Sequence, residues 1–115
     1  MLRIRKEQVA TLQDHALTSL KLRMQAQLEL YWAPLCEQLG ADGVVFFVDH
    51  AIQRCSFYGV EQENDHMRYL NAMALLGADF DEELDWVGHY MENRNVRGGA
   101  RIGDLCAAIM REVNS

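Results

Sequence analysis

The sequence has little of what marks multidomain, membrane or exported proteins. It holds one proline in 115 residues and no proline- or serine-rich stretch, so no linker divides it. No run of about 18 uninterrupted apolar residues is present, and no apolar segment follows the basic start MLRIRKEQ. We therefore expect one folded domain over residues 1–115, with neither a membrane span nor a Sec signal.

Cysteine is also scarce. Cys36, Cys55 and Cys106 are odd in number, widely spaced and set in apolar patterns. Such cysteines are typical of reduced core residues rather than of a disulfide framework. The pattern predicts a cytoplasmic protein.

The sequence has fewer basic than acidic residues, 11 Lys and Arg and 17 Asp and Glu, which gives a net charge of -6. This balance argues against a nucleic-acid partner, because nucleic-acid binders need a cationic surface. The acids concentrate in residues 42–92, where Arg54 and Arg68 are the only bases. The acidic middle is explained either by attraction of a basic protein partner or by the need for a soluble surface.

Apolar residues recur at steps of three and four from about Arg5 to Trp32, which predicts one long helix. Ala33 precedes Pro34 and so disfavours helical dihedrals, which ends that helix, and a short helix is expected from Pro34 to Gly40. The predicted inner stripe consists of Val9, Leu12, Ala16, Leu20, Met24, Leu28 and Tyr31.

Residues 44–48 form a continuous apolar run that suits either a buried strand or a helix. Asp42 as an N-cap and Gly59 as a C-terminal glycine favour a central helix between them. Its inner positions would be Val44, Phe47, Ala51, Cys55 and Tyr58.

Three more helices are expected, two before a loop at 93–99 and one after it. One ends at Gly77, one begins at about Asp81, and one covers 100–113. The sequence thus predicts an all-α, single-domain, compact bundle of five to six helices with a long first helix. The inner residues would be Met67, Leu70, Met73, Ala74 and Leu76, then Leu84, Val87 and Met91, then Ile102, Leu105, Cys106 and Ile109.

The stretch GADFDEELDW, residues 77–86, is the densest acidic segment. As a calcium loop it would need glycine at Leu84 and a bidentate acid at Tyr90, and it has neither. We therefore interpret Asp81 as a helix N-cap and its acidic neighbours as residues that complement the helix dipole.

The other candidates for chemistry are isolated. Glu63 and His66 make one Glu-x-x-His, but di-iron bundles need a second copy, so we expect His66 on the surface. His15, His50 and His89 lack ligand spacing, and RGGARIG lacks the features of a phosphate loop. No catalytic residue, metal or cofactor is predicted, so the protein is not expected to be an enzyme.

Trp86 and Tyr90 follow the acidic segment and are either core residues or anchors of a protein interface. The interface hypothesis joins them to the neighbouring acids in one partner-binding face. That face would consist of Glu82, Glu83, Asp85, Trp86 and Tyr90.

The segment from Arg54 to Trp86 resembles a family of small helical proteins encoded in bacterial type VI secretion effector clusters. The shared pattern is preceded by RIRKEQ near the start of the chain. It comprises Arg54, Tyr58-Gly59-Val60, Glu63, Asp65, Tyr69-Leu70, Met73, Gly77, Asp79-Phe80-Asp81 and Trp86.

The resemblance implies a non-enzymatic protein-binding accessory factor, a co-chaperone or adaptor component that assists a type VI secretion effector. Its partner would be the effector or an adaptor chaperone. Two alternatives stay open: an immunity protein that neutralises a toxin, and a small metal-binding helical enzyme using Glu63, His66 and the acids at 79–85.

Overall fold

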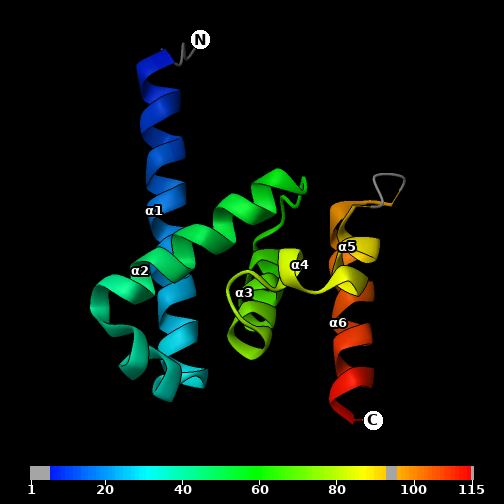
Figure 1. Cartoon of the computed structure of the whole chain (residues 1–115). Helices are drawn as coiled ribbons and strands as arrows, with labels where there is room; N and C mark the ends of the chain where they lie inside the picture. Colours follow the sequence, from blue (N-terminus) through cyan, green and yellow to red (C-terminus); the bar gives the residue numbers. More distant parts are fainter. Residues whose placement is uncertain (1–5, 93–95, 115) are drawn as a thin grey trace.

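Six α-helices make up the described part of the chain, residues 6–92 and 96–114 of a computed structural model, and no strand occurs there (Figure 1). This confirms the predicted all-α bundle with a long first helix. In the same residues, no helix is both long and apolar enough to cross a membrane. The helices are α1 (Lys6–Tyr31), α2 (Ala33–Phe57), α3 (Glu63–Leu76), α4 (Phe80–Glu83), α5 (Asp85–Met91) and α6 (Gly98–Asn114).

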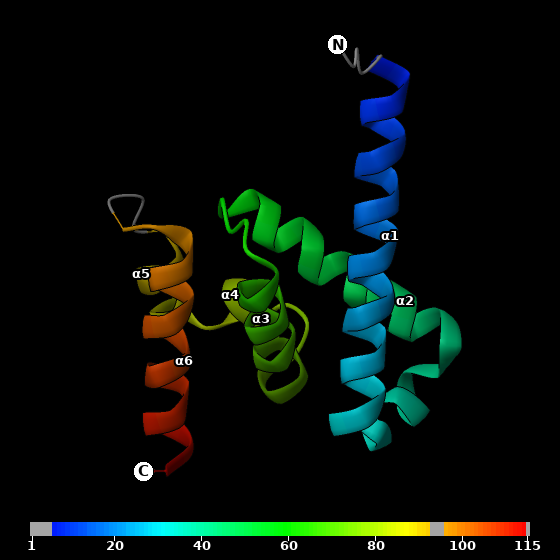
Figure 2. The same ribbon diagram turned by 180° about the vertical axis from the view of Figure 1, so that it is seen from behind.

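Helix α3 lies in the middle of the bundle, between α1 and α6, and Figure 2 shows the same order from behind. Helix α2 crosses α1 and packs on α3, while α5 lies against α6. The molecule measures 58 × 38 × 19 Å. Its smallest dimension is that of two helix layers, because packed helix axes lie about 8–10 Å apart.

Among the described side chains of helix α1, burial begins at Leu20. Leu20, Met24 and Leu28 are buried as predicted, but Ala16 and Tyr31 are exposed, so the predicted stripe was too long. The reason is tertiary, since α2 and α3 contact α1 only over the middle and end of its length (Figure 1). Residues 1–5, which include the first half of RIRKEQ, and the side chains of Val9 and Leu12 lie outside the described part of the chain.

Residues 44–48 are helical, which settles the choice between strand and helix. Helix α2 begins after Trp32, has Pro34 in its first turn, and bends at Gly40 (φ 74°, ψ 172°), where the short predicted helix ends. Beyond the bend it buries Val44, Phe47, Val48, Ala51 and Cys55. The segment is helical as predicted, but its predicted central position is wrong, because α3 holds the middle of the bundle and Val45 and Phe46 are exposed.

The end of α2 is a Schellman motif, as a glycine at position 59 predicts. Gly59 has φ 70°, its N–H donates to the Ser56 carbonyl (3.1 Å), and the Val60 N–H donates to the Cys55 carbonyl (2.8 Å). Val60 and Cys55 are both buried beside these bonds. The turn therefore fixes the direction in which the chain leaves α2.

Helix α3 ends at Gly77 (φ 108°), whose N–H donates to the Met73 carbonyl at 2.7 Å, as predicted. Leu70 and Met73 are buried, but so is His66, at 7% exposure, so its predicted surface position was wrong. His66 Nδ1 lies 2.8 Å from the Gln62 carbonyl oxygen. Of the other predicted inner residues, Met67, Ala74 and Leu76 are only half-buried.

The acidic segment forms two helices rather than one, because Leu84 takes an extended conformation (φ -108°, ψ 106°) between α4 and α5. Asp81 lies inside α4 with its side chain buried, so the predicted N-cap was wrong. Leu84 is half-buried, while Val87 and Met91 of α5 are fully buried as predicted.

Helix α6 packs between α3 and α5 and starts at Gly98, two residues earlier than predicted. Ile102, Leu105 and Ile109 are buried as predicted, and Cys106 is half-buried. The predicted loop is correspondingly shorter, and its residues 93–95 lie outside the described chain.

The first turn of α6 packs tightly on the turn after α2. A Cβ added at Gly98 would lie 2.8 Å from the Gly59 carbonyl oxygen, which is backbone and cannot step aside. We predict that Gly98→Ala lowers the free energy of unfolding by about 1–3 kcal/mol, the usual cost of overpacking. Urea denaturation followed by circular dichroism measures this.

The matched control is Gly103→Ala in the same helix, where the nearest atom to an added Cβ is 3.9 Å away. This substitution should raise the free energy of unfolding by up to about 1 kcal/mol, because alanine is the better helix former. Equal effects of the two substitutions would contradict the close contact at Gly98.

Candidate functional site

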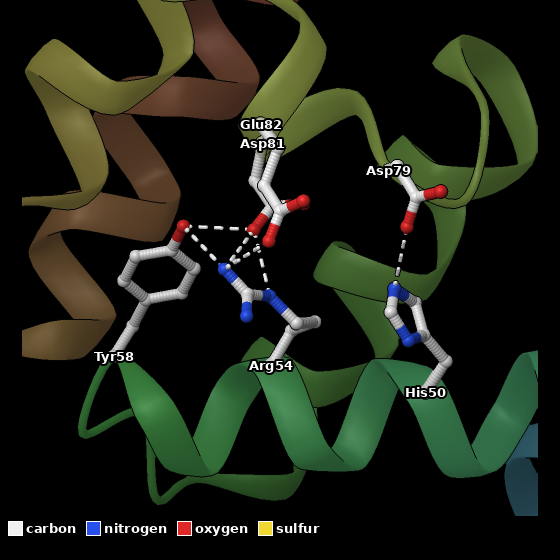
Figure 3. A network of polar contacts seen from close by, with 6 residues as sticks. All are labelled: His50, Arg54, Tyr58, Asp79, Asp81 and Glu82. Atoms are coloured by element: carbon white, nitrogen blue, oxygen red, sulfur yellow. Dashed lines mark hydrogen bonds and ion pairs between the residues drawn. The ribbon is translucent and has the colours of Figure 1, made fainter.

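Three polar side chains at steps of four residues line one face of α2: His50, Arg54 and Tyr58. They point toward the acidic segment, where Asp79, Asp81 and Glu82 face them (Figure 3). His50 Nε2 lies 3.2 Å from Asp79 Oδ1. The acidic segment is thus held along α2 by paired polar groups.

Asp81 is the centre of this arrangement. Its side chain is only 1% exposed, and its Oδ2 accepts hydrogen bonds from Arg54 Nε (2.7 Å) and the Tyr58 hydroxyl (2.8 Å). Arg54 Nη2 lies 2.5 Å from the same oxygen and also donates to the Tyr58 hydroxyl (3.1 Å). The three residues form a closed network, which holds a carboxylate where an unpaired charge would be costly.

Burial disfavours the charge of Arg54, but its contacts with Tyr58 and Asp81 outweigh this and raise the pKa of the guanidinium. Burial, together with the hydrogen bond to Asp81, raises the pKa of the Tyr58 hydroxyl. Arg54 also stacks on Phe57, with its Cζ 4.7 Å from the ring centroid. Both shifts favour the protonated forms that can donate to Asp81, the charged guanidinium and the neutral hydroxyl.

Beside this network is a cleft of about 660 Å³ between the end of α2, α4 and α5, which we call the acidic cleft. Arg54 and Asp81 line it and neutralise each other. Three more carboxylates line it against this single arginine, those of Asp85, Glu92 and Glu82, the last of which lies 3.6 Å from Arg54. The cleft therefore carries surplus negative charge and is suited to a cationic group.

The structure brings part of the predicted partner-binding face to this cleft. Glu82 and Asp85 line it, and Glu82 also lies 3.6 Å from Arg54. Glu83 is exposed on α4 but is not part of the lining. Trp86 and Tyr90 are half-buried on α5, with ring centroids 6.5 Å apart in an edge-to-face contact, and they pack against the core.

Side chains with potential for metal or nucleophilic chemistry are dispersed. Across residues 6–92 and 96–114, no group of three or more His, Cys, Asp or Glu side chains is arranged to hold a metal ion. The three cysteines are free, and of them only Cys55 is fully buried. Burial raises the pKa of its thiol to about 12 and also raises those of Cys36 and Cys106, so reactive thiolate is scarce at neutral pH.

Two features of the site were missed in the sequence. Arg54 is one of only two bases in an acidic segment and lies on a helix predicted to be central, which was a signal for a buried ion pair. Arg101 is buried and donates to the carbonyls of Met91 (2.5 Å) and Tyr58, so it joins α6 to the ends of α5 and α2. No spacing in the sequence pointed to Arg101.

Comparison of the chain with models of protein families, with curated proteins and with solved structures finds no match.

We predict that Arg54→Ala lowers the free energy of unfolding by about 3–5 kcal/mol, because it leaves the Asp81 carboxylate buried without its ion partner. Urea denaturation at pH 7 measures the loss. The matched control is Arg23→Ala, which removes an exposed arginine lying 2.5 Å from the exposed Glu63. It should cost no more than about 1 kcal/mol.

The double variant Arg54→Met with Asp81→Leu removes both charges and should recover most of the loss, since a buried ion pair can be replaced by apolar groups. No recovery would contradict the view that Arg54→Ala acts through an unpaired charge.

Alkaline pH should destabilise the fold. Burial raises the pKa of Cys55 above its ordinary value of 9.0 to about 12, and raises those of Tyr58 and Tyr69 above 10.0. The unfolded chain therefore releases these protons first, so the stability held by the neutral groups is complete below about pH 9 and is lost as the pH rises toward 12. Urea midpoints between pH 7 and pH 11 measure this, and Cys55→Ala should lose less over the same interval.

Proposed function

We propose that this protein is a non-enzymatic, cytoplasmic, protein-binding accessory factor, a co-chaperone or adaptor component that assists a type VI secretion effector. The resemblance over Arg54 to Trp86 supports the secretion context. The partner is the effector or its adaptor chaperone, and no nucleic acid, membrane or cofactor is required.

The observation that carries the proposal is the acidic cleft. The network of Arg54, Tyr58 and Asp81 lines it, and the carboxylates of Glu82, Asp85 and Glu92 add negative charge against that single arginine. A preformed site of one charge sign attracts a partner of the opposite sign and raises its rate of association. Binding is therefore the activity that this geometry serves best.

Affinity purification of the tagged protein from its native cytoplasm tests the proposal. We expect a stoichiometric effector or adaptor chaperone among the co-purified proteins identified by mass spectrometry. The matched control bait is the double variant Glu82→Gln with Asp85→Asn, which neutralises two of these carboxylates and should recover less of the same partner. Recovery of the protein alone with a bound metal or small molecule would overturn the proposal in favour of a metal-binding enzyme.

A second candidate is an immunity protein, and the surplus negative charge of the acidic cleft favours it, because a toxin that acts on nucleic acid presents a basic site. Co-expression distinguishes the two. An immunity protein rescues cells from the toxin encoded beside it, whereas a co-chaperone increases the amount of effector secreted without protecting the cell.

A further inference from the structure

Arg101 is a buried arginine that connects two of the elements around the acidic cleft. It lies in the first turn of α6 and is 5% exposed. Its Nη1 donates to the Met91 carbonyl at 2.5 Å, and its Nη2 donates to the Tyr58 carbonyl. Met91 is the last residue of α5, and Tyr58 directly follows α2. One guanidinium therefore serves the carboxyl ends of two helices.

The chemistry of arginine suits this position. The last carbonyls of a helix have no partner within it and carry the negative end of the helix dipole, so a cation stabilises them. A guanidinium also presents its N–H groups in a rigid planar fork. The two carbonyl groups that Arg101 binds are therefore held at a fixed separation.

The same two carbonyls belong to different sides of the acidic cleft. Tyr58 lines the side formed by α2, and Glu92, which follows Met91, lines the side formed by α5. Helix α5 has only seven residues, too few to be stable alone. The position of Glu92 therefore depends on the contacts at the end of α5, among them the bond from Arg101 to Met91. Arg101 itself does not line the cleft.

Glu82 reaches the same cleft by a different route. It lies on α4, and the neighbouring Asp81 is paired with Arg54 of α2 at 2.5 Å. Phe80 of α4 is also fully buried. This support does not pass through Met91, so Glu82 keeps its place if the end of α5 moves. The cleft thus offers two carboxylates for comparison, one beside the Arg101 contact and one held by the network.

We propose that Arg101 is a positioning residue for the acidic cleft, an inference that rests on the proposed protein-binding function. Through the Met91 carbonyl it holds Glu92 at the separation from α2 at which a cationic group of the partner contacts both sides. Arg101 acts through Glu92 and does not touch the partner. Without the fork, Glu92 no longer contributes to binding, whereas Glu82 still does.

Fluorescence anisotropy of a fluorescein-labelled octa-arginine peptide at low salt measures binding to the full chain. Glu92→Gln and Glu82→Gln should each weaken binding by about threefold to fivefold, the scale of one surface charge contact. Arg101→Lys keeps the charge but lacks the planar fork. It should weaken binding by about the same factor as Glu92→Gln.

Double-mutant cycles separate positioning from a general loss of structure. In the Arg101→Lys chain, Glu92→Gln should weaken binding by less than about twofold, because Glu92 is already displaced. In that chain, Glu82→Gln should still weaken binding by about threefold to fivefold, since sites without shared contacts behave additively. A merely structural role for Arg101 would reduce the effects of both acids alike.

The control for stability is Leu28→Ala, which removes a buried side chain of α1 that does not line the cleft. It should leave the dissociation constant of the folded protein unchanged. Circular dichroism at the assay temperature checks that every variant is folded. If Arg101→Lys is not, Gly98→Ala replaces it in the cycles, because an added Cβ there lies 2.8 Å from the Gly59 carbonyl oxygen and displaces the same turn of α6.

The outcomes distinguish the two proposals. If Glu82→Gln and Glu92→Gln both weaken binding but neither is coupled to Arg101, or both are coupled equally, the positioning role is overturned and binding by the cleft stands. If neither substitution changes binding of the peptide, the cleft is not a cation site, and the observation that carries the proposed function is lost as well.

Discussion

The buried carboxylate of Asp81 is the constraint on which this structure depends. A charge this well shielded from water is tolerated only beside a partner, and here Arg54 and Tyr58 both contact Oδ2. Helix α4 has four residues, far too few to be stable alone. It is held instead by this network and by Phe80, which is fully buried against Tyr69 with ring centroids 5.2 Å apart.

The end of α2 links the network around Asp81 to helix α6. Tyr58 contributes its hydroxyl to the network and its carbonyl to Arg101 of α6. The Schellman turn at Gly59 then brings the chain back beneath Gly98, where α6 begins. One turn thus joins α2, α4 and α6, and the acidic cleft lies beside it with a fixed floor and charged walls. A site preorganised in this way avoids part of the entropic cost of binding.

The residues that carry the resemblance to the type VI secretion family are largely ones that build the fold. Arg54, Tyr58 and Asp81 form the network, and Gly59 and Gly77 end helices at positive φ. They maintain the cleft, while Glu82 and Glu92, which line it, are outside the shared pattern. The resemblance therefore concerns architecture more directly than specificity, and binding by the cleft is the link between it and the proposed function.

Local rules in the sequence determined most of the secondary structure. Apolar periodicity placed α1, α2, α3 and α6, and the glycines at 59 and 77 placed two helix ends, because positive φ and orphan carbonyls are properties of a few neighbouring residues. The predictions that were wrong concern residues whose neighbours in space are distant in sequence. Asp81 has the composition of an N-cap, yet it is buried because Arg54, 27 residues earlier, can reach it.

Contacts between residues distant in sequence also explain the other differences between the predicted and the observed structure. The burial of His66 on α3 and the exposure of Ala16 on α1 depend on which neighbouring elements reach them, and no periodicity carries that information. Of the acids predicted to bind a partner, the fold brings Glu82 and Asp85 into one cleft with Glu92 and leaves Glu83 outside its lining. The sequence by itself determined the helices and an acidic surface, whereas the tertiary structure decided which charges are paired and which are left exposed, because pairing depends on distance in space.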